Sequence, residues 1–218
     1  IRPYARLLAM LGDQLIKNER IALMELVKNA YDADADWVRI TFESFGEKWE
    51  TGPNSKIVIE DNGSGMTESV IEKAWMNPAT PHKRRERSED RLTPTKHRVV
   101  QGEKGIGRFA MLKLGARITV TTRPEKSAEE YVILLDFSAY DPEFTTHNKK
   151  PRELFLDDLS GLLTVRTATA IVPRKVNIGG AKRQTGSTGT RIEIECLKST
   201  WSQDKLDAVA SDALKLQP

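Results

Sequence analysis

The sequence predicts an α/β (α+β) fold, because stretches with helical and with strand periodicity both recur along its 218 residues. Glu25 to Ala35 (ELVKNAYDADA) carries apolar residues at helical spacing, whereas Lys56 to Glu60 (KIVIE) and Thr190 to Leu197 (TRIEIECL) alternate as strands do. Apolar residues make up 39% of the chain and charged residues 30%, which is typical of a globular protein with a substantial core. The length favours one domain with a large insertion over two domains.

Two helices are predicted at the start of the chain. The first spans Tyr4 to Ile16, and Asn18 is a suitable N-cap for the second, which contains ELVKNAYDADA. In this second helix Glu25, Asn29 and Asp32 share the face opposite the apolar stripe. A plain surface helix gives the same pattern. However, a carboxylate that can take a proton from water, one turn from an amide that can bind Mg²⁺, also suits phosphoryl chemistry.

The first strands of the chain lead into a glycine motif. After a predicted strand from Trp37 to Phe42, the strand Lys56 to Glu60 runs directly into DNGSGM, Asp61 to Met66. DNG alone is an ordinary hairpin turn, but here a short helix capped by Thr67 follows it instead of a returning strand. A carboxylate fixed at a strand end, such as Asp61, can accept a hydrogen bond from the exocyclic amine of adenine. Glycine allows close backbone approach to the flat ring, and methionine can pack on its face.

The stretch from Asn77 to Gln101 has no regular periodicity. Between Lys83 and Arg98 it contains seven basic and three acidic residues. A run of this kind is usually a solvated loop, and a mobile nucleotide lid is itself a solvated loop, so the two interpretations overlap.

A second glycine motif, GEKGIGRFAMLKLG (Gly102 to Gly115), is predicted to start as a turn and continue as a helix. Such a loop presents free backbone N–H groups and the positive end of a helix to phosphates, and Lys104 or Arg108 can add charge. A plain glycine turn before a core helix is the alternative. The motif is neither a Walker P-loop nor a Rossmann fingerprint, so phosphate binding here requires a different fold.

The remainder of the chain is mostly strand-like. Ser138 to Gly186, where charge, proline and glycine interrupt weak strand patterns, is the least regular part and is taken as the insertion. The predicted elements are strands at Arg117 to Thr122, Tyr131 to Phe137, Leu162 to Thr169, Ile171 to Ile178 and Thr190 to Leu197, and a closing helix from Trp201 to Leu216.

Several classes of protein are disfavoured by composition. A net charge of +3 gives no global basic field for nucleic acid or anionic membrane. The single cysteine, Cys196, excludes an intramolecular disulfide, which is compatible with a cytoplasmic location, and no apolar run approaches the length of a membrane span. Because the chain begins with Ile1 instead of methionine, we expect it to be part of a longer protein.

Four motifs together resemble the sequence boxes of the GHKL ATPases, the superfamily of type II topoisomerases, ninety-kilodalton heat-shock chaperones, histidine kinases, MutL and MORC proteins. They are ELVKNAYDA, DNGSGM, GEKGIGRFA and GSTGTRIEIE, in this order, within Leu11 to Leu197. The third box is most similar to chaperone-like and MORC-like members. The resemblance implies the Bergerat fold, a two-layer sandwich in which a mixed, mostly antiparallel sheet has its helices on one face.

The resemblance also implies roles for individual residues. Glu25 matches the general base, Asn29 the Mg²⁺ ligand and Asp61 the acid that reads adenine, while Asp32 is interpreted as a structural acid. The other matched positions lie beside the base, on the lid, in the phosphate loop or at the adenine-binding threonine: Gly65, Met66, Asn77, Thr80, Lys83, Lys104, Gly105, Ile106, Gly107, Arg108 and Thr190.

Three functions are compatible with these residues. The first is a Mg-ATP hydrolase that drives a conformational or dimerisation cycle; the second is an ATP-gated clamp without significant hydrolysis; the third is a histidine-kinase-like catalytic domain. The residue matching Glu25 is usually lacking in the kinases, which favours the first. The resemblance further implies a nucleotide-dependent homodimer in the longer protein and a downstream Lys or Arg that contacts phosphate. A client protein or nucleic acid stays open as the partner.

Overall fold

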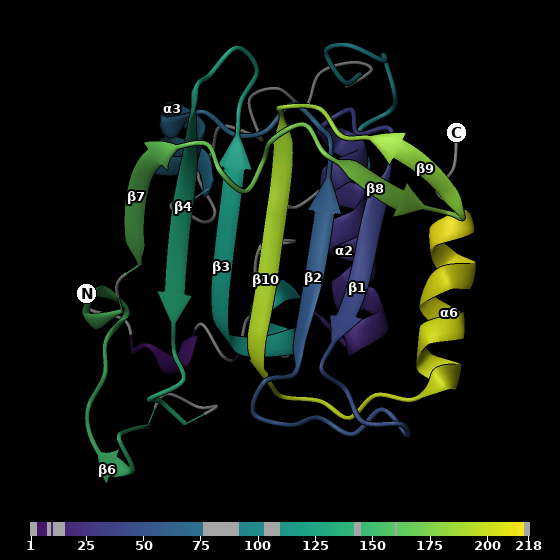
Figure 1. Cartoon of the computed structure of the whole chain (residues 1–218). Coiled ribbons are helices and arrows are strands. Elements are labelled where there is room, and N and C mark those ends of the chain that lie inside the picture. The colour runs from purple at the N-terminus through teal and green to yellow at the C-terminus, as the bar shows by residue number, and fades with distance from the viewer. Residues whose placement is uncertain are drawn as a thin grey trace.

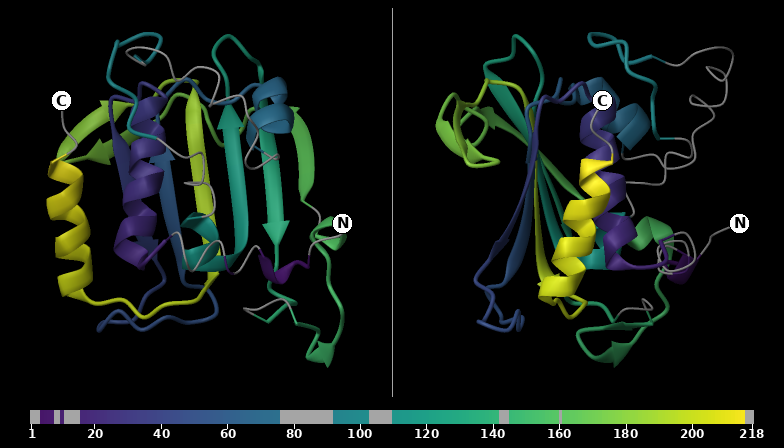
Figure 2. Two further views of the ribbon diagram at one scale, coloured as in Figure 1. Left: turned by 180° about the vertical axis from the view of Figure 1, so that it is seen from behind. Right: turned by 90° about the vertical axis from the view of Figure 1, so that its right-hand side faces the viewer.

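The computed structural model describes residues 4–7, 10, 16–75, 92–102, 110–141, 145–159 and 161–215. They form two layers, a six-stranded sheet in the order β1-β2-β10-β3-β4-β7 and a set of helices on one of its faces (Figures 1 and 2). The predicted two-layer, largely antiparallel fold is confirmed, and every strand pairing within the described residues is antiparallel.

The elements follow the sequence prediction closely. The sheet consists of β1 (Val38–Glu43), β2 (Lys56–Asp61), β3 (Gly115–Arg123), β4 (Glu129–Asp136), β7 (Leu162–Thr167) and β10 (Gly189–Leu197). The helices are α2 (Glu19–Asp32), α3 (Glu68–Val70), η1 (Ile71–Trp75), α5 (Ala110–Leu114), η3 (Leu156–Asp158) and α6 (Gln203–Leu214). Two small hairpins pair β5 (Thr146–His147) with β6 (Lys150–Pro151), and β8 (Lys175–Ile178) with β9 (Ala181–Gln184).

Helix α2 begins where its cap predicts. The Asn18 side chain accepts a hydrogen bond from the backbone N–H of Ile21 at 2.9 Å, which satisfies one of the free donors of the first turn. Leu23 and Leu26 are buried against the sheet and the neighbouring helices, whereas Glu25 and Asn29 lie outside this core. The helix therefore holds its polar face clear of the sheet.

The core lies between the sheet and its helices. Inward side chains at alternate positions of the central strands are almost completely buried, as the period of two predicts: Ile57, Ile59, Ile118, Val120, Ile133 and Ile194. Trp201 and Val209 close the core from the C-terminal side. Each such side chain contributes about 1.5–3 kcal/mol when it is fully removed from water. This packed layer therefore holds the ends of the central strands in a fixed position.

The stretch from Ser138 to Gly186 differs most from expectation. Its β7 pairs with β4 as an edge strand of the main sheet, whereas its β5–β6 and β8–β9 hairpins form separate two-stranded sheets. The strand predicted from Ile171 begins only at Lys175, because the N–H groups of Ala170 and Ile171 donate to the Glu130 carboxylate instead of entering a ladder. The hairpin of β8 and β9 then lies on the sheet face opposite the helices (Figure 2).

Two further predictions concern helices. Thr67 caps α3 as expected, its hydroxyl accepting from the Val70 N–H at 3.3 Å. Of the helix predicted over Tyr4 to Ile16, the structure describes helical residues at Arg6, Leu7 and Met10. Among the helices that are described, none has the length and apolar character needed to span a bilayer.

Candidate functional site

Three adjacent central strands, β2, β10 and β3, bring a row of polar side chains together at one end of the strands. Antiparallel register places Thr190 of β10 opposite Asp61 of β2 on one side and opposite Thr122 of β3 on the other. The two threonine hydroxyls lie 3.1 Å apart, and the Thr190 N–H lies 3.3 Å from Asp61 Oδ1. Positions 61 and 190 are thus neighbours, as expected from their predicted common role, although 129 residues separate them.

The Asp61 carboxylate is held through one oxygen. Oδ1 accepts both the Gly63 N–H at 2.9 Å and the Thr190 N–H, while Oδ2 has no hydrogen bond to any residue in the described part of the chain. Burial raises the pKa of Asp61 to about 6, because these two hydrogen bonds only partly offset the loss of water. The carboxylate is therefore oriented, and its second oxygen remains an acceptor.

The DNGSGM loop is closed onto the end of β3. The Met66 N–H donates to the Thr122 hydroxyl at 2.9 Å. Gly65 has a φ of +68°, and a Cβ there would lie 2.1 Å from the Arg123 carbonyl oxygen. Only glycine fits this conformation and this close approach. The expected reason for Gly65 was approach to a ligand; in the structure its close neighbour is the backbone of β3.

The same loop also contacts the end of α2. The Ser64 N–H donates to the Ala33 carbonyl at 2.8 Å, and the Asn62 side chain accepts the N–H groups of Asp36 and Trp37 at 2.8 and 3.2 Å. Asp61 is thereby positioned beside the C-terminal end of the helix that carries Glu25 and Asn29.

The two residues predicted to act on phosphate have different surroundings. Glu25 is half-buried, and one of its oxygens accepts from the Lys28 ammonium at 2.9 Å. Asn29 is exposed, and its side-chain amide makes no hydrogen bond to another described residue. A free amide one turn from a carboxylate is suited to contact a phosphate-bound cation.

Three aspartates at or just after the end of α2 contact the segment 92–102, and two of them, Asp32 and Asp34, hold its backbone. The Asp34 carboxylate accepts from the Thr93 hydroxyl, from the Thr95 N–H at 2.8 Å and from the Lys96 N–H at 3.2 Å. Asp32 accepts the N–H groups of Gln101 and Gly102 at 2.7 and 2.9 Å, in keeping with its interpretation as a structural acid. The third aspartate, Asp36, pairs with the Lys96 ammonium. The first residue of the second glycine motif is thus fixed beside α2.

Several predicted site residues lie outside the described residues, so the structure gives no position for them. They are the lid residues Asn77, Thr80 and Lys83 and the phosphate-loop residues Lys104, Gly105, Ile106, Gly107 and Arg108.

Sequence reasoning missed Thr122 and Gly189. The Thr122 hydroxyl contacts Met66, Thr190 and the Gly189 carbonyl, and it is completely buried. Gly189 has a φ of +131°, and a Cβ there would lie 2.1 Å from the Asp61 carbonyl oxygen. Strand pairing was the missing information, since only the register of β3 with β10 brings Thr122 into the row.

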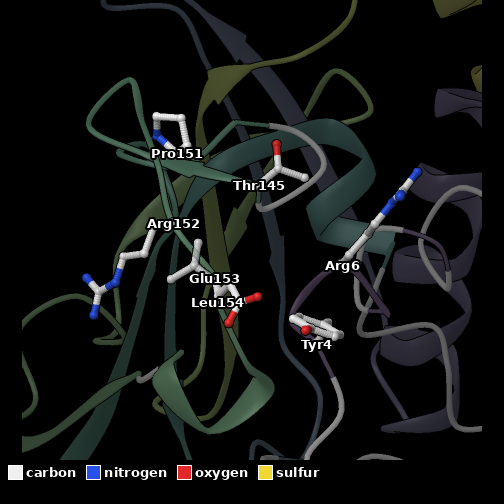
Figure 3. Close-up of a pocket in the computed structure, with 7 residues that line it drawn as sticks. All are labelled: Tyr4, Arg6, Thr145, Pro151, Arg152, Glu153 and Leu154. Carbon is white, nitrogen blue, oxygen red and sulfur yellow. The ribbon is translucent and has the colours of Figure 1, made fainter.

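A cavity of about 560 Å³ lies elsewhere, between the N-terminal segment and the loop before η3. Tyr4 and Arg6 lie on one side of it and Pro151, Arg152, Glu153 and Leu154 on the other, with Thr145 nearby (Figure 3). A much smaller space, about 20 Å³, is lined by Asp61 and Thr190 among others. A binding site also requires polar groups that converge on one point and a residue with a shifted pKa, and the structure has both at Asp61.

Comparison with known proteins identifies the family of the chain. Residues 17–156 match the family model described as "Histidine kinase-, DNA gyrase B-, and HSP90-like ATPase". The chain is also similar to the chaperone protein HtpG of Chromobacterium violaceum (24% identity) and of Ruthia magnifica subsp. Calyptogena magnifica (27% identity). Each alignment covers 93% of this chain and 36% of the relative, so the chain spans about a third of the length of these proteins. The match over more than half of its residues places the chain in the family of histidine kinase-, DNA gyrase B- and HSP90-like ATPases.

Proposed function

We propose that this chain binds Mg-ATP as a single domain and hydrolyses it slowly. The observation that carries the proposal is the geometry of Asp61, whose Oδ1 is fixed by two N–H groups while Oδ2 lacks a partner within the described residues. An acceptor that is oriented and unsatisfied is suited to an amine of the ligand, and leaving it unpaired costs free energy.

Adenine would be recognised at the polar row. The exocyclic amine donates to Asp61 Oδ2, and the Thr190 hydroxyl, which is already paired with Thr122, can hold a water that bridges to the ring. Met66, partly buried against the core, is available to the ring face. The hydrogen bonds from Gly63 and Thr190 fix the direction of the acceptor before ligand arrives, which lowers the entropy lost on binding.

The residues present fit a magnesium ion that is bound mainly through phosphate. No group of three or more potential Asp, Glu, His or Cys ligands occurs in the described parts of the chain. Mg²⁺ usually keeps several waters and takes one or two protein ligands together with substrate phosphates, so the free amide oxygen of Asn29 is sufficient. When bound, the ion neutralises negative charge that develops on the phosphates.

Glu25 is the proposed general base. Its carboxylate lies one helical turn before Asn29 on the same face of α2, so a water held near the γ-phosphate can pass its proton to Glu25. By resemblance, Gly105 and Gly107 with Lys104, Ile106 and Arg108 form the loop around the phosphates, and Asn77, Thr80 and Lys83 belong to the lid. Backbone N–H groups of such a loop stabilise charge in the transition state.

Single-turnover hydrolysis with excess enzyme tests this assignment. Glu25→Ala is expected to retain Mg-ATP affinity and to lose at least about 10²-fold in rate, the usual contribution of a positioned base. Asn29→Ala is expected to weaken Mg-dependent binding itself, because it removes a metal ligand. Asn18→Ala, which removes only the helix cap, is a control for altered stability of α2. An unchanged rate in Glu25→Ala would contradict the assignment of the base.

One observation favours an ATP-gated clamp as the second candidate. The Lys28 ammonium occupies one oxygen of Glu25 at 2.9 Å and so competes with the proton that Glu25 must accept. Under the hydrolase proposal, Lys28→Met frees the base and raises the single-turnover rate by a few fold. A chain that binds ATP tightly but hydrolyses none in either form is a clamp, and transfer of γ-phosphate to protein identifies the kinase-like alternative.

Two further parts of the proposal, dimerisation and a phosphate contact from another domain, concern the longer protein. We place a nucleotide-dependent homodimer and a phosphate-contacting Lys or Arg from a downstream domain in the longer protein. The relatives named chaperone protein HtpG support a conformational cycle acting on a client. Analytical ultracentrifugation with and without a non-hydrolysable ATP analogue tests the dimer.

A further inference from the structure

The basic residues are distributed unevenly along the chain. From Leu159 to Ile192 the sequence contains no acidic residue, although the whole chain has a net charge of only +3. The six basic residues of this stretch are Arg166, Arg174, Lys175, Lys182, Arg183 and Arg191. Positive charge is therefore concentrated in and around the hairpin of β8 and β9.

Half of these cations neutralise buried carboxylates. Arg166 donates to Glu130 at 2.8 Å, and Arg191 donates to Glu60 at 2.8 Å, with Arg174 as a second partner of Glu60. The remaining three, Lys175, Lys182 and Arg183, are exposed and form no ion pair with any residue that the structure describes. Their charge is free to attract an anionic partner.

The hairpin presents one polar face to solvent. Its register pairs Lys175 with Gln184 and Asn177 with Lys182, so these four exposed side chains project from the same face. The other face carries Val176, which is buried, the partly buried Ile178 and, opposite Val176, the exposed Arg183, which therefore does not belong to the polar face. The outward face thus consists of two ammonium groups and two carboxamides, arranged diagonally.

The base of the hairpin is firmly anchored. Glu130 holds the preceding turn through the N–H groups of Ala170 and Ile171, and Glu60 holds Arg174. The Thr185 hydroxyl accepts the Arg174 N–H at 2.8 Å and donates to the Val172 carbonyl at 3.0 Å. The hairpin lies on the side of the sheet opposite the helices (Figure 2). Because its base is fixed and Val176 is buried, the polar face is held towards solvent.

We propose that the outward face of the β8–β9 hairpin binds double-stranded DNA. A two-stranded ribbon is about 5 Å between strand axes, and four residues per strand extend about 13 Å. The major groove of B-DNA, about 12 Å wide, admits such a ribbon. Lysines at two diagonal positions can contact phosphates, and carboxamides between them can hydrogen-bond to base edges.

Other polyanions fit this face less well. A membrane-binding surface combines basic residues with apolar side chains that enter the bilayer, and the outward face has none. The deep, narrow major groove of double-stranded RNA cannot admit the ribbon. Anionic membranes and double-stranded RNA are therefore tested as alternative partners.

Fluorescence anisotropy with a short labelled DNA duplex of mixed sequence, over a salt series, tests the proposal. Lys175→Gln/Lys182→Gln is expected to weaken binding at low salt at least about tenfold and to reduce the salt slope by about 2, since each phosphate contact contributes about 0.9. The matched control is Lys149→Gln/Lys150→Gln, which removes the same charge from the distant β5–β6 hairpin (Figure 1). This control should leave both the affinity and the slope unchanged.

A second pair of measurements separates contact from folding. Mg-ATP affinity and the melting temperature of Lys175→Gln/Lys182→Gln should equal those of the wild type, because both lysines are exposed and belong to the outward face of the hairpin. Equal weakening of DNA binding in the two double variants would overturn the proposal. So would tighter binding to RNA duplexes, or to vesicles containing anionic lipid, than to DNA.

Discussion

At the scale of single residues, Asp61 is expected to determine nucleotide affinity. Asp61→Asn keeps an oxygen for the Gly63 and Thr190 N–H groups but turns an NH₂ towards the adenine amine. The hydrogen bond from the adenine amine is then replaced by two N–H donors that face each other. This costs about 2–3 kcal/mol of binding free energy, which is a loss of roughly 30–150-fold in affinity. Calorimetric titration with Mg-ATP measures this change. Equal affinities in a variant whose circular dichroism is unaltered would remove the adenine assignment.

Thr122 is the second residue whose role is specific. Thr122→Val preserves the shape of the side chain but leaves the Met66 N–H without its acceptor, so we expect a loss of about 1–2 kcal/mol in stability together with weaker ATP binding. Thr121→Val is a matched control, since Thr121 is a buried neighbour on the other face of β3 and makes no side-chain hydrogen bond to a described residue. Chemical denaturation compares the two variants. A similar cost in both would show that the hydroxyl of Thr122 has no special contact.

At the scale of elements, the end of α2 and the segment 92–102 form one unit. Asp34 has a φ of +60°, a conformation that asparagine also adopts, so Asp34→Asn changes the hydrogen bonds without straining the backbone. The amide loses at least one of the contacts to Thr93, Thr95 and Lys96. Faster hydrogen exchange in residues 92–102 and a several-fold weaker affinity for Mg-ATP are the expected results.

The neighbouring Asp36 provides the control for this unit. It is exposed and its ion pair with Lys96 is screened by water, so Asp36→Asn should change exchange and affinity little. If Asp34→Asn behaves like Asp36→Asn, the segment 92–102 is held by contacts other than the Asp34 carboxylate.

At the scale of the whole molecule, the sequence was sufficient wherever the determinant is local. Asn18 and Thr67 cap their helices as predicted, and the strand patterns at Lys56 to Glu60 and Thr190 to Leu197 correctly predicted β2 and β10. What failed depends on contacts between distant segments. The late start of β8 results from Glu130, which lies about 40 residues earlier and captures the N–H groups of Ala170 and Ile171.

The candidate site shows the same division. Asp61 and Thr190 were found by their motifs, but the motifs contain no information on Thr122, which enters the row only through pairing of β3 with β10. The anchoring of residues 92–102 by Asp34 also requires the tertiary fold, because 59 residues separate Asp34 from Thr93. Residue types predicted the chemistry, and strand register determined which side chains meet.

The stability of the whole protein should reflect the burial of Asp61. Its folded-state pKa of about 6 is higher than the unfolded value of 3.8, so the folded state holds the proton more tightly. Between these two values the free energy of unfolding falls as pH rises, and the full penalty is present above about pH 6.

Asparagine carries no charge, and it retains the oxygen that accepts both backbone N–H groups. After a discount for the partial exposure of the residue, Asp61→Asn should stabilise the nucleotide-free protein by about 1 kcal/mol at about pH 7.5, or roughly 2–4 °C in melting temperature. This gain should shrink towards about pH 4.5 and vanish below about pH 4. Differential scanning calorimetry of both proteins across this range, without nucleotide, measures it. A gain that is independent of pH, or a loss at about pH 7.5, would mean that the ionised Asp61 carboxylate carries no cost in the folded protein. We expect the Asp61 carboxylate to favour ATP binding and to lower the stability of the nucleotide-free protein.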